Sequence, residues 1–523
     1  MIRVNQIKVD INNDNLLLKI SKKLKIHSSL ISKYKIIKKS IDARDKSNIN
    51  YVYEVDVEIA CEDKILKMNL KDVSKSPKEE YALPEMGNIK LNTRPIIVGS
   101  GPAGLFCAYL LAESGYKPII LERGEKVEDR VKTVEKFHNT NKLNINSNIQ
   151  FGEGGAGTFS DGKLNTLTKD KSFRNKKVLE TFYENGAPEE ILYINKPHIG
   201  TDILREVIIN MRNKILKLGG EIHYNSCVTN LIIEKDELKG VEVNNKEKIM
   251  SDIIVLAIGH SARDTFKMLH ANNLYMKPKN FAVGLRIEHP KEMIDESQYG
   301  SFSKMLPSAS YKLTYQTKTG RGVYSFCMCP GGYVINASSE ENKLCINGMS
   351  NFKRDAKNSN SAIVVTITPE DFGKDIFSGV EFQEGIEKLA YKEGTGQIPV
   401  QTYKDFKENR VTTSFGEYTP NTKGEYKMAN LNNILPEYIT SAIKEAMPNF
   451  GKKIKNFDRD DAIFLGIESR TSSPIIIVRN EHFMSSIKGI YPCGEGAGYA
   501  GGIITAAIDG IKVAEEIIKT YHA

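Results

Sequence analysis

The stretch IIVGSGPAGLFCAYLLAESGYKPIILERG, residues 96–124, joins a short β-branched run, a glycine-rich turn, an apolar helical segment and a second apolar run. Its glycines follow the G-x-G-x-x-G spacing that places a dinucleotide pyrophosphate at a helix N-terminus. Gly99 permits the tight turn, Gly101 lets the backbone approach the phosphates, and Gly104 lets the helix pack on the strand. Pro102 suits the first helical turn, where a missing N–H is tolerated. We therefore predict a strand, a helix and a strand that together bind a dinucleotide.

The second apolar run of this stretch ends in Glu122. Its position is close to the spacing of about 20 residues at which an acidic side chain accepts a hydrogen bond from the adenosine ribose. A carboxylate at that point also disfavours a 2′-phosphate. The cofactor contacts that we predict from this segment are Gly99, Ser100, Gly101, Pro102, Ala103, Gly104, Glu122 and Arg123.

A second glycine-rich loop, FGEGGAGTFSDGKL at residues 151–164, follows a charged helical segment. A plain NAD-binding domain would instead continue through further strand and helix units. Glycines let the backbone come close to a pyrophosphate or a flat ring, so we predict cofactor contacts at Gly154, Gly155 and Thr158. A flexible surface loop is the alternative interpretation.

The segment GIYPCGEGAGYAGGIITAAIDGIKVAEEI, residues 489–517, indicates a strand, a glycine-rich turn and a helix that begins near Gly502. It resembles the closing motif of FAD-dependent oxidoreductases of the glutathione reductase and para-hydroxybenzoate hydroxylase type. The resemblance implies that Glu495, where most relatives carry Asp, hydrogen-bonds the ribityl chain, and that the helix N-terminus faces the flavin pyrimidine edge. A helix N-terminus stabilises the negative charge of reduced flavin. The implied contacts are Gly494, Glu495, Gly502 and Ile503.

The middle of the chain supplies the other contacts that this resemblance implies. In those families a backbone group near Val228 meets the adenine, and SDIIVLAIGHSARDTF, residues 251–266, matches the strand and small-residue turn at Gly259. His260 replaces the small residue that is usual there. Three separate segments thus converge on one non-covalent FAD. No second G-x-G-x-x-G unit follows a convincing strand, so we expect NAD(P)H only as a transient co-substrate.

The strings GTFSDGKL, CMCPGG, ESRTSSP and GEGAGYAGGI extend the likeness over the whole chain. Together they resemble a bacterial family of uncharacterised FAD-dependent dehydrogenases, or NAD(FAD)-utilising dehydrogenases, within the two-dinucleotide-binding, glutathione reductase-like flavoprotein superfamily. This resemblance implies an FAD-dependent oxidoreductase that transfers a hydride between bound flavin and a small molecule. It implies no particular substrate.

We predict an α/β fold, in which a Rossmann-like FAD-binding domain carries an inserted α+β substrate domain and a small N-terminal α/β domain. The predicted N-terminal domain consists of a strand, two helical stretches and a further strand. The predicted boundaries are 1–90 for the N-terminal domain, 91–275 and 459–523 for the two parts of the FAD-binding domain, and 276–458 for the substrate domain.

Eight lysines and no acidic residue lie within residues 19–39. A solvated face is the interpretation that we favour, because no aromatic residue other than Tyr34 is interleaved for stacking on bases. Nucleic acid is therefore not an expected partner. The alternative function is a flavin-binding module that recognises RNA or a protein through this basic domain, and a redox partner protein remains compatible with either function.

Three basic residues are the catalytic candidates. Arg470 lies two residues after Glu468, so it either anchors an anionic substrate or stabilises charge on the flavin, and an ion pair with Glu468 is the structural alternative. Arg286, with Glu288 and His289, forms a second set, and Lys163 could tune the flavin potential.

Cys327 and Cys329 flank Met328 on an expected strand, so their side chains should share one face. A redox pair or a metal site there is weighed against plain packing, and we favour packing and assign no metal site, because no second ligand pair has suitable spacing.

The composition sets few further limits. The chain has 523 residues, a net charge of +8 and seven scattered cysteines, which do not form a secreted disulfide framework. The N-terminal residues lack a signal-peptide pattern, and no apolar run approaches the roughly 20 residues that span a bilayer. We therefore expect a cytoplasmic protein without a membrane partner.

Overall fold

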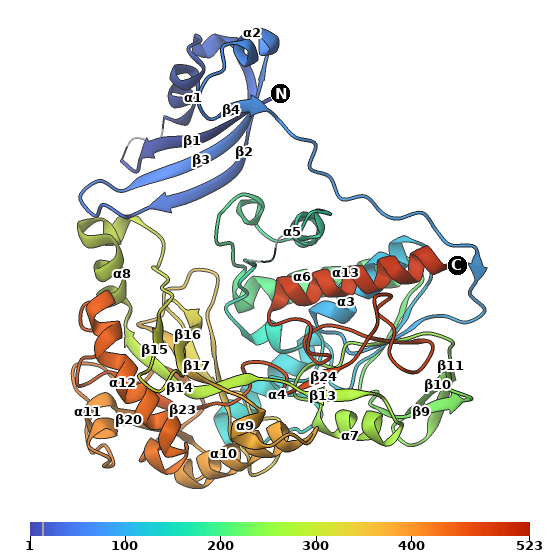
Figure 1. Ribbon diagram of the computed structural model, residues 1–523. Helices are drawn as coiled ribbons and strands as arrows, with labels where there is room; N and C mark the ends of the chain where they lie inside the picture. Colours follow the sequence, from blue (N-terminus) through green and yellow to red (C-terminus); the bar gives the residue numbers. More distant parts are fainter. Residues whose placement is uncertain (13–14, 167, 169) are drawn as a thin grey trace.

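The computed structural model describes residues 1–12, 15–166, 168 and 170–523 (Figure 1). It shows a small N-terminal sheet with two helices, a parallel sheet flanked by long helices, and a larger, mainly antiparallel sheet with its own helices. The predicted α/β class with a Rossmann-like domain is confirmed.

The N-terminal unit has the order β-α-β-β-α-β, and its sheet order β2-β3-β1-β4 is that of the ferredoxin-like fold. The second predicted helical stretch is wrong, because residues 31–42 form strand β2 and pair with β3 along their length. Sheet pairing by β-branched residues overrides a weak helical pattern. The elements are β1 (Ile2–Asp10), α1 (Leu16–Leu24), β2 (Ile31–Asp42), β3 (Asn50–Ile59), α2 (Glu62–Lys67) and β4 (Val73–Lys75).

The N-terminal unit is joined to the rest of the molecule at two places. The segment after β4 runs as an extended chain to β5 (Ile89–Lys90), which pairs with the C-terminal strand β26 (Tyr521–His522) (Figure 1). The edge strand β2 also bonds the body of the molecule: Lys39 N donates to Tyr193 O at 2.7 Å, and Asn195 N donates to Lys39 O at 2.9 Å. These bonds cover part of an otherwise open sheet edge.

The parallel sheet has the order β25-β12-β6-β7-β8. Its strands are β6 (Ile96–Val98), β7 (Ile119–Leu121), β8 (Glu221–His223), β12 (Ile254–Leu256) and β25 (Ile490–Pro492). The buried residues on one face of this sheet pack with α3 (Pro102–Glu113), α6 (Gly200–Lys217) and α13 (Ile503–Thr520). Helix α3 follows β6 after a short turn, and α13 follows β25 after a longer glycine-rich loop, so both helices begin on the carboxyl side of the strand before them.

Smaller elements complete this part of the chain. A three-stranded antiparallel sheet has the order β11-β10-β9. The elements are β9 (Val228–Glu234), β10 (Glu237–Val243), β11 (Glu247–Met250), α4 (Val127–Thr140), α5 (Arg174–Glu184) and α7 (Arg263–Ala271), with the pair β13 (Met276–Pro278) and β24 (Ile475–Ile477).

The larger sheet has the order β15-β16-β19-β14-β23-β20-β22. One of its central strands, β23, begins at Ile463, so the sheet includes residues beyond 458. Its strands are β14 (Phe281–Pro290), β15 (Thr314–Gln316), β16 (Gly322–Cys329), β19 (Asn358–Ile367), β20 (Ile398–Thr402), β22 (Tyr426–Met428) and β23 (Ile463–Glu468).

The helices of this unit are α8 (Lys291–Tyr299), α9 (Pro369–Phe372), α10 (Ser378–Gly394), α11 (Tyr403–Lys407) and α12 (Glu437–Lys453). A small sheet of β18 (Ile346–Met349), β17 (Tyr333–Asn336) and β21 (Thr422–Lys423) lies beside them. Across the part of the chain that the structure describes, no helix combines the length and apolarity that crossing a membrane requires.

Candidate active site

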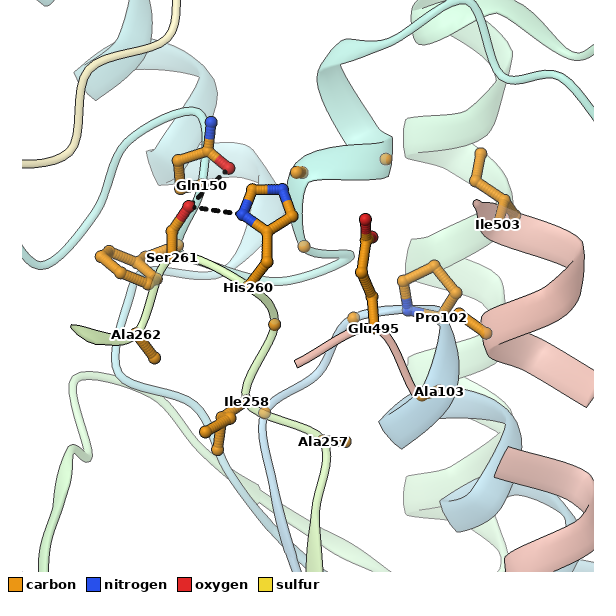
Figure 2. Close-up of a pocket in the computed structure, with 18 of the residues that line it drawn as sticks. Pro102, Ala103, Gln150, Ala257, Ile258, His260, Ser261, Ala262, Glu495 and Ile503 are labelled. Carbon is orange, nitrogen blue, oxygen red and sulfur yellow. Dashed lines mark hydrogen bonds between the residues drawn. The ribbon is translucent and has the colours of Figure 1, made fainter. Parts of the chain in front are cut away.

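A cavity of about 240 Å³ opens at the carboxyl ends of the parallel strands (Figure 2). Val98, Leu121, Ala257 and Cys493, which end or follow four of these strands, all line it. The opposite wall comes from the unit built on the larger sheet, which we call the inserted unit because its strands β14 to β23 lie in sequence between β12 and β25 of the parallel sheet. The predicted cofactor residues that line the cavity are Gly99, Gly101, Pro102, Ala103, Glu122, Arg123, Gly155, Val228, Gly259, Glu495, Gly502 and Ile503.

The remaining predicted cofactor residues, Ser100, Gly104, Gly154, Thr158 and Gly494, are not among the residues that line the cavity. Ser100 donates to Glu122, and Thr158 Oγ1 donates to Glu153 O at 3.1 Å. A Cβ on Gly104 would lie 1.9 Å from Gly99 O, and one on Gly494 would lie 2.6 Å from the Ala103 Cβ. These residues therefore shape the wall through close packing.

The glycine positions at the cavity fit a large bound group. A Cβ built on Gly259, Gly501 or Gly502 would meet no atom within 4 Å, so these residues border open space. The N-cap of α3 is Gly101, and the N-cap of α13 is Gly502, neither of which uses a side chain to satisfy the first N–H groups. Two helix N-termini with free N–H groups suit a group with two phosphates and an electron-rich ring.

Glu122 is fully hydrogen-bonded within the protein. Its Oε2 accepts from Ser100 N and Oγ at 2.9 and 2.7 Å, and its Oε1 accepts from Gly124 N and Gly152 N at 2.9 and 3.0 Å. A carboxylate offers about four acceptor positions, and all four are in use. A hydrogen bond from the ribose to Glu122 stays a prediction and would have to replace or share one of these contacts.

Arg123, the next residue, has one N–H donor that no protein group accepts. Its guanidinium lies 4.2 Å from the ring centre of Phe151 and donates to both carboxylate oxygens of Asp264, at 3.0 and 2.8 Å. Its Nε is buried and has no partner. Because a buried donor without a partner is costly, Arg123 is suited to a polar group in the cavity.

His260 projects into the cavity opposite Glu495 (Figure 2). Its Nδ1 lies 2.9 Å from Ser261 Oγ, which also donates to Gln150 Oε1 at 3.2 Å. Burial, with the charges of two arginines, lowers the pKa of His260 to about 3, so the imidazole is neutral near pH 7. The sequence singled His260 out as an unusually large residue in the turn but did not place it among the site residues.

Glu495 stands on the opposite side of the cavity, beside the start of α3 (Figure 2). Burial raises its pKa to about 7, and the charge of Lys279 only partly opposes this effect. Near neutral pH the side chain is therefore divided between an acid that can donate a hydrogen bond and a carboxylate that can only accept.

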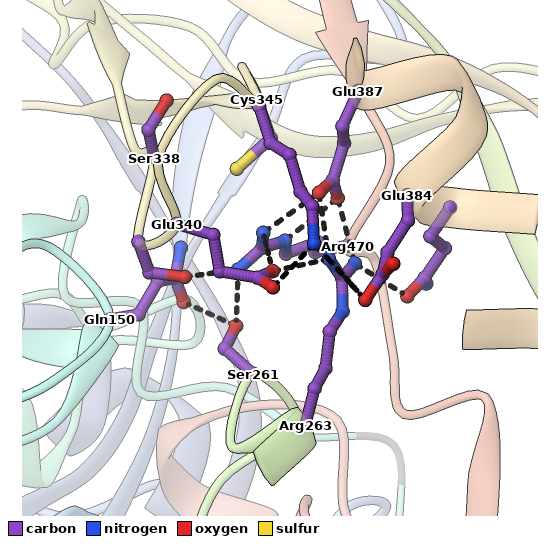
Figure 3. A network of polar contacts seen from close by, with 12 residues as sticks. Gln150, Ser261, Arg263, Ser338, Glu340, Cys345, Glu384, Glu387 and Arg470 are labelled. Carbon is purple, nitrogen blue, oxygen red and sulfur yellow. Dashed lines mark hydrogen bonds and ion pairs between the residues drawn. The ribbon is translucent and has the colours of Figure 1, made fainter. Parts of the chain in front are cut away.

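Arg470 lines the cavity, but its ion-pair partners are Glu387 and Glu340 and not Glu468 (Figure 3). Arg263 donates to the same carboxylate at 2.9 Å from each of two nitrogens. Arg470 Nη1 also donates to Ser261 Oγ at 3.1 Å, which links the network to His260. Arg470 is thus held by the inserted unit and by the turn after β12.

Arg286 does not line the cavity. It is fully buried, and its guanidinium donates to Glu468 Oε2 at 2.8 Å, Asn360 Oδ1 at 2.9 Å and Cys327 O at 2.6 Å. Glu288 and His289 are also fully buried and outside the cavity lining. The structure therefore gives Arg286 a supporting position behind the wall and not a position against a bound group.

Lys163, the third catalytic candidate, lines the cavity beside Asp161. Its Nζ lies 3.0 Å from Asp161 Oδ2, and its side chain is 31% exposed. Burial is the largest single effect and lowers the pKa of Lys163, but the Asp161 carboxylate together with other nearby groups raises that pKa overall. Lys163 is therefore charged at neutral pH.

Cys327 and Cys329 both line the cavity, but the regular strand that we expected around them is interrupted. The pairing of β16 with β19 shifts register between Phe326 and Cys329, and Cys327 has a φ of 42°. A bulge breaks the alternation of a strand, so the Cys327 residue is exposed and Cys329 is buried. Both are free thiols. Although the Cys327 residue as a whole is exposed, its thiol is surrounded by protein atoms, and burial raises the pKa of both thiols.

Comparison with known proteins adds the cofactor. Residues 280–471 match the family described as FAD-dependent protein, C-terminal domain-like, and residues 97–149 match the NAD(P)-binding Rossmann-like domain. Residues 1–58 match a domain of unknown function. The chain is thus an FAD-dependent protein with a Rossmann-like nucleotide-binding domain, and its cofactor is FAD.

An uncharacterized protein of Clostridium beijerinckii is 48% identical over 530 residues, which cover 99% of each chain. The chain belongs to the same family as this protein.

Several solved structures match much of the chain at low sequence identity and with low TM-scores. L-proline dehydrogenase from P. horikoshii matches with a TM-score of 0.33 and 14% identity, over 82% of this chain and 94% of its own. FqzB matches with a TM-score of 0.35 and 13% identity, over 83% of this chain and 76% of its own. Halogenase PltM matches with a TM-score of 0.37 and 11% identity, over 81% of this chain and 67% of its own.

Proposed function

We propose that the protein is an FAD-dependent oxidoreductase of the glutathione reductase-like superfamily, which transfers a hydride between bound flavin and a small molecule. The observation that carries this proposal is the shared cavity. Segments around Gly101, Gly259 and Gly502 form one wall, and charged and polar residues of the inserted unit form the other. One cavity can thus hold a dinucleotide and place a second molecule against it.

The chain's own residues divide into binding and covering groups. The N-terminus of α3 and the loop at Gly155 would hold the pyrophosphate, Arg123 would donate to the nucleotide half, and the N-terminus of α13 would face the ring system. When bound, FAD supplies the hydride acceptor and donor that no side chain provides. The inserted unit would exclude water from the opposite side.

NAD(P)H is proposed as a visiting co-substrate and not as a resident one. The string GTGQIP, residues 394–399, begins at the last residue of α10 and leads into β20. A phosphate turn needs the reverse order, a strand followed by a helix. A nicotinamide would therefore reach the flavin from the open side of the cavity, and a redox protein is the alternative electron donor.

The experiment is anaerobic stopped-flow absorbance near 450 nm on the FAD-loaded protein, with NADH and NADPH added separately. Rapid bleaching by one of them is the expected result. Dithionite is the control, because it reduces any accessible flavin. Flavin that dithionite bleaches, but that neither nicotinamide nor a panel of small-molecule reductants bleaches, would contradict the oxidoreductase function.

The lysine-rich segment is proposed to be a solvated face and not a nucleic-acid site. Seven of its eight lysines lie on α1 or strand β2, Lys23 pairs with Asp72 at 3.0 Å, and Lys39 lies over the Tyr51 ring. We expect no retention on immobilised RNA at physiological salt. Retention that falls steeply with salt, and that is lost when the exposed Lys33 and Lys35 are replaced by Gln, would contradict this proposal.

A further inference from the structure

We propose that the small molecule which meets the flavin carries a carboxylate, and that Lys163 binds this carboxylate. The inference deepens the proposed function and rests on it. It is carried by the charge balance of the cavity wall that residues 160–163 and the inserted unit form, together with the position of the Lys163 ammonium in that wall.

The charged residues in and behind this wall form three sets. In two of these sets the numbers of cations and carboxylates are equal. Arg286 and Glu468 form a one-to-one pair at 2.8 Å. The network of Figure 3 has three cations and three carboxylates, namely Arg263, Arg470, Lys343, Glu340, Glu384 and Glu387. Neither group has charge left for a ligand.

The third group has one cation too many. Arg354 donates from Nε and Nη2 to the two oxygens of Asp161, at 2.8 and 2.5 Å, and Ser350 Oγ also donates to this carboxylate. This bidentate pair already neutralises Asp161. Lys163 approaches the same carboxylate at 3.0 Å, so Lys163, Arg354 and Asp161 together carry a net charge of +1.

The surplus charge faces the cavity. Of this trio, Lys163 and Asp161 line the cavity and Arg354 does not. An ammonium has three N–H donors, and among the described residues the structure gives Lys163 Nζ one partner, the Asp161 carboxylate. A partly buried cation is most stable with a full set of acceptors, which an anion in the cavity would complete.

The backbone fixes the place of this ammonium. Lys163 forms a bridge with His198, and Leu164 N donates to Pro197 O at 2.8 Å. The loop before it is tied to the inserted unit through Asp161 and Arg354. Lys163 therefore lies on a loop whose position is fixed by hydrogen bonds and an ion pair, and not on a free surface segment.

The rest of this wall favours a singly charged ligand. Cys327 and Cys329 are neutral, because burial raises the pKa of both thiols. Asn347 Oδ1 accepts from Arg286 and from Gly348 N, which leaves the Asn347 amide nitrogen as a neutral donor at the cavity. One point charge and one neutral donor suit a carboxylate, whereas a phosphate dianion calls for more cations or an arginine fork.

The test uses the FAD-loaded full chain and follows the visible absorption of the flavin during titration with benzoate and with its uncharged analogue benzamide. We expect benzoate to perturb the spectrum and to bind at least about tenfold more tightly than benzamide. In Lys163→Met the benzoate dissociation constant should rise at least about tenfold, and Lys163→Arg should recover most of the loss. Lys318→Met, which removes an exposed lysine outside the cavity lining, is the matched control and should match the wild type.

Equal binding of benzoate and benzamide by the wild type, or no binding of benzoate, would overturn the inference without any variant. Equal benzoate affinity in Lys163→Met and the wild type would also overturn it. A changed flavin reduction potential in Lys163→Met with unchanged benzoate binding would assign Lys163 to the flavin instead. Benzoate binding needs no turnover, so it tests the carboxylate site alone. The stopped-flow experiment with nicotinamide and other reductants tests the oxidoreductase function, and the two proposals can therefore fail independently.

Discussion

Arg470 and Glu387 are joined by two hydrogen bonds of 2.8 Å, from Nε to Oε1 and from Nη2 to Oε2. Glu387 lies on α10, and Arg470 follows β23 and lines the cavity. Arg263, at the start of α7 in the nucleotide-binding part, shares the carboxylate (Figure 3). Through Arg263, the Glu387 carboxylate therefore connects the two parts of the molecule at the edge of the cavity.

Replacement of Glu387 by Gln should strongly destabilise the protein. The carboxylate is fully buried and accepts from both Arg470 and Arg263, so its loss leaves these two buried guanidinium groups with the more exposed Glu340 as their shared counter-ion. We expect the free energy of unfolding to fall by about 3–5 kcal/mol in urea titrations. Glu384→Gln is the control, because this more exposed carboxylate pairs with Lys343 at 3.1 Å, and the expected loss is under about 1 kcal/mol.

The same pair has a pH signature. Burial would raise the pKa of Glu387, but Arg470 and Arg263 hold it well below the ordinary 4.5. Because the Glu387 carboxyl has a lower pKa in the folded than in the unfolded protein, its ionised form stabilises the folded protein above pH 4.5. This stabilisation is lost as the pH falls below 4.5. The stability gap between the wild type and Glu387→Gln should thus be widest near pH 7 and shrink in acid. A constant gap would contradict the ion pair.

Gly101→Val should abolish FAD retention while the protein stays folded. Gly101 has an extended backbone, with φ −71° and ψ −178°, and the nearest atom to a built Cβ is 3.7 Å away. The side chain would instead occupy the space at the start of α3 that borders the cavity. The measurement is the ratio of flavin to protein absorbance after gel filtration, with circular dichroism as the check of folding. Full flavin occupancy would contradict the proposed position of the pyrophosphate.

Gly104→Ala is the matched contrast to this variant. A Cβ there would lie 1.9 Å from Gly99 O, so the helix would have to move off the strand. We expect a loss of about 1–3 kcal/mol in the free energy of unfolding. Loss of FAD should then follow the loss of stability, whereas Gly101→Val separates the two.

The segments that contact the cavity could be predicted because each carries its own local signal. The turn at Gly101 and the closing helix after Gly502 are short-range patterns of glycine spacing and apolar periodicity. The ion pairs could not be predicted in this way. Arg470 lies two residues from Glu468 in sequence, yet its partner is Glu387, because the docking of α10 against the end of β23 decides which carboxylate is near.

The error in the N-terminal unit has a similar cause. Residues 31–42 mix lysine with isoleucine, and neither helical nor strand periodicity is strict there. Pairing with β3 decides the outcome, and bulges at two points of that pairing absorb the irregular pattern. The position of Cys327 was missed for the same reason, since a bulge is a property of two strands and not of one.

Cys327 and Cys329 should not act as a redox pair. Reactive cysteines have lowered pKa values, whereas burial raises the pKa of Cys327 to about 12 and also raises that of Cys329. Cys329→Ser should therefore reduce and reoxidise its flavin at rates within about twofold of the wild type. Cys327→Ser is the control for the exposed position. A variant whose flavin is reduced normally but can no longer pass electrons on would show that the thiols take part.

Glu495→Gln should change how the stability of the FAD-free protein depends on pH. Burial raises the pKa of Glu495 from 4.5 to about 7. Because the pKa of Glu495 is higher in the folded than in the unfolded protein, folding favours the protonated carboxyl. The stability that this protonated group contributes is fully present below pH 4.5 and is lost as the pH rises through about 7. The wild type should thus lose stability relative to Glu495→Gln between pH 5 and pH 8, as followed by urea midpoints. The exposed Glu481→Gln should run parallel to the wild type. Parallel curves for Glu495→Gln would show that the carboxylate is already ionised at acidic pH, and a permanently charged group at this point of the cavity could accept a hydrogen bond but never donate one.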